Sequence, residues 1–239
     1  MISLGGSRIV PDKVDDKFLV RFKKLIDSHP LEKFVVVTGG GSTARKYISA
    51  LKKLGKGTKS QSMEGIAITR LHAGFLARFF APLDSKHRTG QGFVVPRNMR
   101  KVKNLLGKNH VVFCGALRWK RRNTSDGTAA RLAGFLKCPF INLTNVKGLY
   151  NSDPRTNKKA RHRAYPSSGG ARFIPKISWD KFLKLAKSVK FEAGQHFVLD
   201  QSAARTIKKK KIVTYIVGSL GAIDSILRDG NFVGTEIRG

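Results

Sequence analysis

The sequence feature that most constrains the fold is FVVVTGGGSTARKY, residues 34–47. Three consecutive valines, Val35 to Val37, form a continuous apolar run of the kind found in fully buried strands. Three glycines at 39–41 interrupt this run, and helix-forming residues resume at Ala44. A strand, a glycine turn and a helix start leave backbone N–H groups that an anion can approach without meeting a Cβ atom. The pattern outlines a phosphate-binding turn, although an ordinary strand-to-helix turn explains it equally well when it is taken alone.

Length and composition limit the class of protein. A chain of 239 residues with 41% hydrophobic residues can bury a full core, and it fits one large α/β domain or two small lobes. No apolar run reaches the roughly 18 residues that a membrane span needs, and the first residues lack the pattern of a signal peptide. We therefore expect a soluble, cytoplasmic protein with no membrane association. Cys114 and Cys138 lie in apolar runs and are expected to be buried free thiols.

The charge is unusual, because 47 Lys and Arg residues face 15 Asp and Glu residues and give a formal net charge of +32. A nucleotide enzyme needs only a few cations for its phosphates, so most of the excess must lie on the surface and repel itself. Three explanations stay open: attraction to the phosphate backbone of RNA or DNA, a lineage with a basic proteome, and engineering towards positive charge. The cations are scattered along the sequence, and this scatter favours a general surface bias over a dedicated nucleic-acid module.

The rest of the chain predicts alternating strands and helices. A first strand opens into a glycine turn at 3–7, and further strands are expected near 92–95, 110–114, 140–143, 212–217 and 234–237. Helices are expected over 15–28, from the glycine triplet to about 54, and over 65–80, 98–106, 127–136, 177–188, 201–209 and 223–227. The segment 65–80 is apolar nearly all round, which predicts burial in a core or at a subunit interface. Residues 151–171 are expected to form a lid or surface loop.

Two aspartates head predicted helices, and a third precedes a proline. Asp126 precedes the helix over 127–136, where a carboxylate can cap exposed N–H groups, and Asp200 heads the helix over 201–209. Asp153 stands before Pro154, which drives it out of helical geometry and closes a turn. Repeated strand, turn and helix units build an open α/β sheet with a ligand crevice at its carboxyl edge.

Seven segments in a fixed order resemble the amino-acid-kinase superfamily and, within it, the archaeal type of uridylate (UMP) kinase. They are ISLGGS at 2–7, TGGGSTARKYI at 38–48, GIAITR at 65–70, TSDGTAA at 124–130, LTNVKGLYNSDPR at 143–155, AGQHFVLDQSAA at 193–204 and GTEI at 234–237. The resemblance implies an α/β fold, a three-layer sandwich with a mainly parallel central sheet. It implies a single domain over 1–239, with the acceptor (UMP) side at roughly 1–138 and the ATP side at roughly 139–239.

The same resemblance implies an activity and its partners. The expected reaction is the phosphorylation of UMP to UDP by ATP, through in-line phosphoryl transfer with Mg²⁺, in pyrimidine nucleotide (CTP) biosynthesis. The expected assembly is a homohexamer. Mg²⁺ would be held mainly through phosphates, so no residue is assigned as a metal ligand.

The resemblance also assigns roles to residues by their position in the motifs. The phosphate-transfer centre would include Gly5, Gly6, Ser7, Asp126 and Asp200, the last orienting backbone and cations on the donor side. The UMP-binding residues would be Gly40, Ser62, Ala116, Leu117, Arg118, Asn123 and Thr124. The ATP-binding residues would be Gly41, Arg45, Thr144, Asn145, Tyr150 and Asp153.

Phosphoryl transfer depends mostly on positioning and charge neutralisation, so it needs no serine nucleophile or histidine base. We therefore expect the histidines at 72, 110 and 196 to be core or surface residues.

Three departures from the family pattern bear on the acceptor. Ser3 replaces the lysine that many superfamily members carry, which archaeal UMP kinases often lack as well. Ser62 stands where the family usually has an aspartate, and the segment 117–123 is longer and more basic than usual. These departures keep open a kinase of another small acid or phosphate acceptor, such as isopentenyl phosphate, carbamate or an amino acid. A second alternative is a kinase-fold protein whose positive charge serves nucleic-acid binding.

Overall fold

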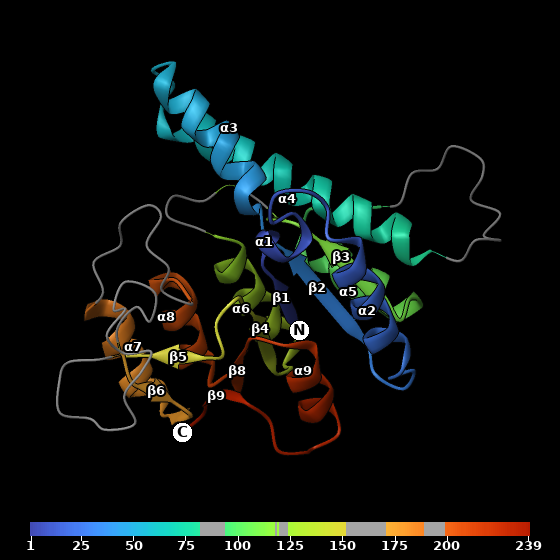
Figure 1. Cartoon of the computed structure of the whole chain (residues 1–239), viewed down its shortest axis with the longest axis vertical. Coiled ribbons are helices and arrows are strands. Elements are labelled where there is room, and N and C mark those ends of the chain that lie inside the picture. Colours follow the sequence, from blue (N-terminus) through green and yellow to red (C-terminus); the bar gives the residue numbers. More distant parts are fainter. Residues whose placement is uncertain (82–93, 118, 120–123, 152–170, 189–198) are drawn as a thin grey trace.

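The structure is a computed structural model, and it describes residues 1–81, 94–117, 119, 124–151, 171–188 and 199–239 (Figure 1). Its centre is a seven-stranded sheet in the order β3-β2-β1-β4-β8-β9-β7. These strands are β1 (Ile2–Leu4), β2 (Phe34–Thr38), β3 (Val111–Cys114), β4 (Phe140–Leu143), β7 (Lys176–Ile177), β8 (Thr214–Val217) and β9 (Gly234–Ile237). The first five strands in the order are parallel, and β9 runs antiparallel to β8. The expected α/β fold with a mainly parallel central sheet is confirmed.

Three short strands were not expected from the sequence. β5 (Leu149–Tyr150) and β6 (Phe173–Ile174) form a separate two-stranded ribbon, and β7 adds an edge to the main sheet. Each has only two residues, which is too short for a periodic pattern. The strand predicted near 92–95 is wrong at Val94 and Val95, which lie in irregular chain, and its first two residues lie outside the described part.

The expected helices form, with shifted ends, and a short helix that was not expected, α1, begins within the predicted glycine turn at 3–7. The helices are α1 (Gly6–Ile9), α2 (Asp16–Asp27), α3 (Gly41–Lys53), α4 (Thr58–Phe80), α5 (Met99–Lys108), α6 (Ser125–Leu136), α7 (Trp179–Ser188), α8 (Gln201–Lys210) and α9 (Leu220–Leu227). The largest difference is the start of α4, which precedes the predicted Gly65 by two turns. Its first turns are mainly polar, so no apolar stripe marks them, and they belong to the hairpin that α4 forms with α3. No described helix is both long and apolar enough to cross a membrane.

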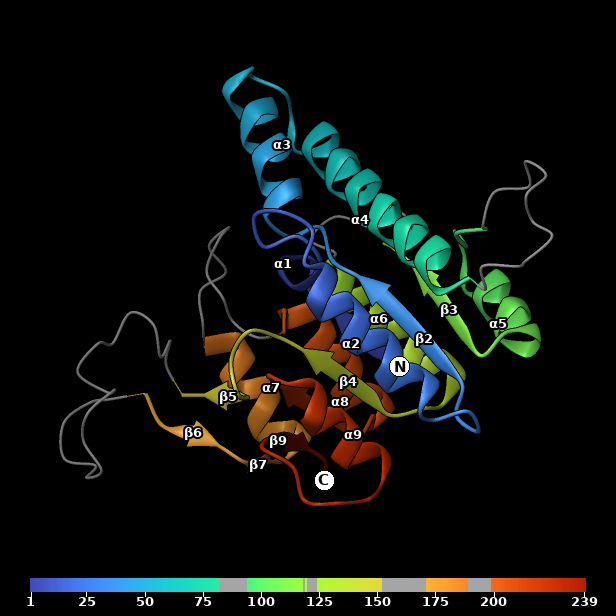
Figure 2. The same ribbon diagram turned by 45° about the vertical axis from the view of Figure 1, so that its right-hand side comes forward.

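Helices cover both faces of the sheet. One core cluster joins the sheet to α5, α6, α7 and α8, and the other joins it to α2, α4 and α9. The valine run serves both clusters, because Val35 and Val37 point into the first and Val36 into the second. Figures 1 and 2 show α3 and α4 side by side, extending as a hairpin beyond the sheet. Cys114 is fully buried and Cys138 partly buried, and both are free thiols.

Parallel pairing brings the ends of five strands to one edge. The residues that follow β1, β2, β3, β4 and β8 are Gly5, Gly39, Gly115, Thr144 and Gly218. The chain builds outward from β1 to β3 and then returns to place β4 on the other side of β1. Such a reversal of strand order opens a crevice at the carboxyl edge, where ligands of open α/β sheets bind.

Candidate active site

The two glycine turns that follow β1 and β2 pack backbone against backbone. A Cβ atom added to Gly6 would lie 2.3 Å from the Gly41 nitrogen and 2.5 Å from the Gly39 oxygen. Gly41 has a φ of +59°, and a Cβ atom there would lie 2.4 Å from the Gly6 carbonyl carbon and 2.6 Å from the Ser7 nitrogen. Side chains are therefore excluded from both turns, and the two backbones together form the floor of the crevice.

The N-terminus of α3 opens onto this floor. Its N-cap is Gly40, which makes no side-chain capping bond, so the first N–H groups of a 13-residue helix are left for another partner. An uncapped helix N-terminus beside two glycine turns is suited to bind an anion such as a phosphate group. His72 lies behind the turn, where its Nδ1 is 2.8 Å from the Gly39 oxygen. It is buried, as expected for a core histidine.

Asp126 lies in the first turn of α6 and contacts β1. The Ser3 hydroxyl donates a hydrogen bond of 2.7 Å to its Oδ1 atom. The residue keeps some exposed surface, but the pKa of its carboxyl is raised to about 6. Burial is the main cause of this raised pKa, the Ser3 hydrogen bond opposes the shift, and the charge of Asp200 adds to it. The buried carboxyl of Asp126 thus faces the crevice with a neutral hydrogen-bond donor, the Ser3 hydroxyl.

Asp200 and Thr124 join the N-termini of α8 and α6. Asp200 caps α8, where its Oδ1 accepts bonds from the N–H groups of Ser202 at 2.6 Å and Ala203 at 2.8 Å. Thr124 caps α6 by accepting a bond of 3.2 Å from the N–H of Gly127, and its hydroxyl donates to the other carboxylate oxygen of Asp200. The crevice therefore receives three helix N-termini and two carboxylates.

Arg8 ties the first glycine turn to the opposite side of the crevice. Its guanidinium donates to the Thr144 carbonyl, with Nη2 at 2.6 Å and Nε at 3.1 Å, and also to the Gly218 carbonyl. Burial lowers its pKa. Sequence reasoning missed this residue. Its partners are carbonyl groups far along the chain, and the available signal was an arginine directly after the glycine motif.

The sequence model of the amino acid kinase family matches residues 1–218. The chain is a member of the amino acid kinase family.

Similar proteins cover the whole chain. It is 31% identical over 249 residues to a uridylate kinase of Methanopyrus kandleri, covering 100% of this chain and 99% of the relative. It is 32% identical to a uridylate kinase of Archaeoglobus fulgidus, covering 99% and 98%. A crystal structure of uridylate kinase from Archaeoglobus fulgidus superposes with a TM-score of 0.78 at 31% identity, covering 99% of this chain and 98% of that one. A UMP kinase structure from Ureaplasma parvum, with a TM-score of 0.74 at 18% identity, supports the fold alone.

Arg70 and Thr69 of α4 hold Ala116 and Leu117, at the start of the expected UMP segment in this family member. Arg70 donates to the Ala116 carbonyl at 3.1 Å and to the Leu117 carbonyl at 2.8 Å. The N–H of Ala116 donates to the Thr69 hydroxyl at 2.9 Å. Arg118 and Asn123 lie outside the described residues.

Ser62 lies in the second turn of α4 and turns its hydroxyl to its own helix. The hydroxyl donates to the Thr58 carbonyl at 2.8 Å, four residues earlier. The aspartate usual in the family would present a carboxylate here, whereas the serine satisfies itself within the helix.

The described residues expected to bind ATP lie beyond β4 and on α3. Thr144 donates its N–H to the Val217 carbonyl at 2.9 Å, and its hydroxyl is 3.4 Å from the Asn145 side chain. Tyr150 stacks at a tilt on Phe173, with ring centroids 5.5 Å apart. Arg45 is exposed on α3 and lines a shallow hollow of about 520 Å³. Asp153 lies outside the described residues.

Proposed function

We propose that this protein phosphorylates UMP to UDP, with ATP as the phosphoryl donor. The observation that carries the proposal is the close packing of two glycine turns at the floor of a crevice lined by helix N-termini. The turns are so close that a Cβ atom added to Gly6 would lie 2.3 Å from the Gly41 nitrogen. Such a floor suits closely spaced phosphates. The chain that builds it is similar over its whole length to uridylate kinases. A cytoplasmic location in nucleotide metabolism belongs to the same proposal.

The proposed acceptor side is formed by the first half of the chain. Gly40, Ala116, Leu117 and Thr124 would border UMP, with Ser62 and the segment around Arg118 and Asn123 completing it. The order of the sheet supports this division, because β2 and β3 lie on one side of β1 while β4 and β8 lie on the other. Residues to about 138 then face the acceptor, within one continuous domain.

The proposed donor side is formed by Gly41, Arg45 and the residues after β4. Thr144, Asn145, Tyr150 and Asp153 would hold the adenosine part of ATP. Arg8 holds the Thr144 carbonyl and so fixes the donor side against the first glycine turn. This tie sets the distance between donor and acceptor, on which in-line transfer depends.

The transfer step would rely on backbone groups and helix N-termini. N–H groups of the turn formed by Gly5, Gly6 and Ser7 and of the α3 start would hold the transferred phosphoryl group while charge spreads over its oxygens. Asp126 and Asp200 would orient the ends of α6 and α8 towards it.

Mg²⁺ fits this arrangement as an ion carried mainly by the phosphates of ATP and by water, since it binds with few protein carboxylates. Asp126 and Asp200 are the carboxylates that the described site offers, and both already accept hydrogen bonds. When bound, the ion would neutralise charge on the phosphates.

The proposed homohexamer needs a face that another subunit can cover. Leu71 and Phe75 lie one turn apart on α4 and expose 61% and 38% of their surface, and Met63 exposes 46% two turns earlier. These three residues, here called the α4 stripe, are large apolar side chains that the described residues of a single chain leave uncovered. We propose that the α4 stripe packs against a second copy.

A coupled assay of ATP consumption with Mg²⁺ tests the activity. UMP, CMP, dTMP, isopentenyl phosphate and carbamate would be compared at low and at moderate salt, and turnover with UMP alone is expected. Turnover with another acceptor instead of UMP would show that the protein is a kinase of that acceptor. No turnover with any of these acceptors would refute the proposed kinase activity. The Ser62→Asp variant, which restores the usual carboxylate, is expected to lower KM for UMP and leave KM for ATP unchanged.

A further inference from the structure

The positive charge of the described residues is unevenly distributed over the two helical layers. The layer formed by α5, α6, α8 and α7, which pack on one another in that order, is here called the basic layer. Its exposed cations are four on α5, one at Lys137 after α6, three on α7 and five on α8 with its C-cap Lys211. Among the described residues of this layer, Asp180 is the one exposed carboxylate, and Lys208 is already bonded to it.

The opposite layer, formed by α2, α4 and α9, is close to balanced. With Asp15 and Asp229 beside them, α2 and α9 carry five cations and five carboxylates: Lys17, Arg21, Lys23, Lys24 and Arg228 against Asp15, Asp16, Asp27, Asp224 and Asp229. α4 adds three cations, Lys59, Arg70 and Arg78, and one carboxylate, Glu64. Several are paired, since Lys23 lies 2.7 Å from Asp27 and Arg228 lies 3.1 Å from Asp224. A uniform surface bias would have charged both layers alike, so folding gathers cations that look scattered in the sequence.

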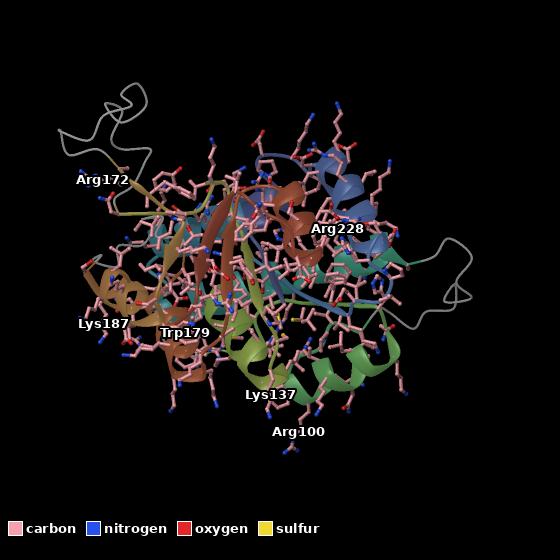
Figure 3. The ribbon with its side chains drawn as sticks, turned by 90° about the horizontal axis from the view of Figure 1, so that it is seen from below. Arg100, Lys137, Arg172, Trp179, Lys187 and Arg228 are labelled. Carbon is pink, nitrogen blue, oxygen red and sulfur yellow. The ribbon has the colours of Figure 1, made fainter. Side chains whose placement is uncertain are left out.

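The position of the basic layer separates it from the proposed chemistry. The N-termini of α6 and α8 face the crevice, whereas Lys137 and the lysines at 208–211 lie at their C-terminal ends. The 12 residues of α6 span about 18 Å at 1.5 Å per residue. Figure 3 shows Arg100, Lys137 and Lys187 projecting from one side of the molecule, with Arg228 on the opposite side of the sheet. Lys137 and the lysines at 208–211 therefore lie at the helix ends away from the proposed phosphate site.

Helix termini explain only part of the charge. Lysines in the last turn of α8 and after α6 interact favourably with helix dipoles. Lys108 and Lys187 also lie in the last turns of α5 and α7. The other cations of these two helices, Arg100, Lys101, Lys103, Lys181 and Lys184, lie earlier and have no such role. Like charges within a Debye length of about 8 Å repel one another. An extended cationic face with this cost calls for an extended anionic partner.

We propose that the basic layer binds the phosphate backbone of nucleic acid, without sequence preference. The backbone carries about one charge per 1.7 Å of duplex, and lysines that neutralise it release condensed counter-ions. An anionic membrane is the less suitable partner. Surface-bound helices insert large apolar side chains, whereas Phe135 is the one strongly exposed large apolar residue among the described residues of this layer. The contacts are to phosphates, so RNA and DNA share the chemistry.

The test compares two matched variants of the full chain by fluorescence anisotropy. The first carries Lys184→Gln, Lys187→Gln and Lys209→Gln on the basic layer, and the second carries Lys13→Gln, Lys17→Gln and Lys24→Gln in and just before α2. All six lysines are exposed, and the two variants have equal net charge. The probes are a single-stranded RNA of about 20 nucleotides and a DNA duplex of similar length, titrated from about 50 to about 300 mM KCl.

The basic-layer variant is expected to bind at least about tenfold more weakly and to lower the salt slope by about 3, while the control changes little. Equal losses in both variants, or no binding by the unmodified protein, would overturn the proposal. Binding to phosphatidylserine vesicles without binding to either nucleic acid would assign the layer to a membrane instead. Thermal midpoints and UMP kinase turnover of each variant report folding, and they separate this result from the fate of the proposed activity.

Discussion

Asp126 is a residue at which proposed function and stability conflict. Its carboxyl has a pKa of about 6 instead of the ordinary 3.8, because burial disfavours the charged form and Ser3 offers a single hydrogen bond. The folded state thus binds this proton more tightly than the unfolded state. The resulting cost is absent below about pH 4, grows as the pH rises to about 6, and is complete above it. Two pKa units correspond to at most about 3 kcal/mol.

Asp126→Asn is therefore expected to stabilise the protein while it removes activity. The amide keeps the size and an acceptor for Ser3 but never ionises, so the free energy of unfolding should rise by about 1 to 3 kcal/mol at pH 8 and barely change at pH 4. Turnover of UMP should fall by about a hundredfold or more. Denaturant titrations at both pH values and the coupled assay measure this. Asp16→Asn, at an exposed position of α2, is the control. If Asp126→Asn instead lost the same amount of stability at both pH values, the account of the buried carboxyl would be refuted.

The glycine turns give a second prediction at the residue scale. Gly41→Ala combines a φ of +59° with a Cβ atom 2.4 Å from the Gly6 backbone, whereas Gly55→Ala has a φ of +69° and nothing within 4 Å. The control should lose about 1 kcal/mol from backbone strain alone, and Gly41→Ala should lose at least about 2 kcal/mol more. Urea unfolding measures the difference. Similar losses in the two variants would mean that the turns are not in close contact.

At the scale of elements, apolar patterning identified the buried strands and the amphipathic helices. The strands 140–143 and 234–237 occur as expected, and the first is a mainly apolar run that follows Pro139. Patterning failed where a segment contacts little. The first turns of α4 are mainly polar, and β5, β6 and β7 depend on pairing with distant partners. Such contacts leave no local signal in the sequence.

The α4 stripe supplies the prediction for an element. Leu71→Glu places a charge at the centre of the proposed interface and is expected to reduce the oligomer to smaller species, with little loss of stability in the single chain because Leu71 is exposed. Light scattering coupled to size exclusion measures the mass. Leu54→Glu is the control, since Leu54 is 71% exposed at the end of α3 and lies outside the stripe. If both variants keep the mass of the unmodified protein, another surface forms the assembly.

For the whole molecule, the sequence predicts the position of the crevice but not the long-range hydrogen bonds that hold it together. The glycine turns and helix-capping aspartates carry local patterns, and parallel strands bring their ends together. The bond from Ser3 to Asp126 joins residues 123 positions apart, and that from Arg8 to Thr144 joins residues 136 apart. No periodicity encodes such pairs. The same holds for charge, since only the fold shows that one layer is basic and the other close to balanced.

Uneven charge predicts a stability that depends on salt and on location. At low ionic strength the Debye length is about 30 Å, so lysines across the basic layer repel one another, and at high salt they are screened. The basic-layer variant, with Lys184, Lys187 and Lys209 changed to Gln, should therefore be more stable than the unmodified protein by about 0.5 to 1 kcal/mol near 10 mM salt. The gain should vanish near 1 M salt.

The control with Lys13, Lys17 and Lys24 changed to Gln removes the same charge from a region where carboxylates neighbour the lysines, so it should gain little or lose stability. Thermal unfolding of both variants across this salt range measures the contrast. Equal gains would mean that net charge alone determines the repulsion. A gain confined to the basic layer would mean that this face is maintained at a cost to folding, which a polyanion bound there would offset by mass action.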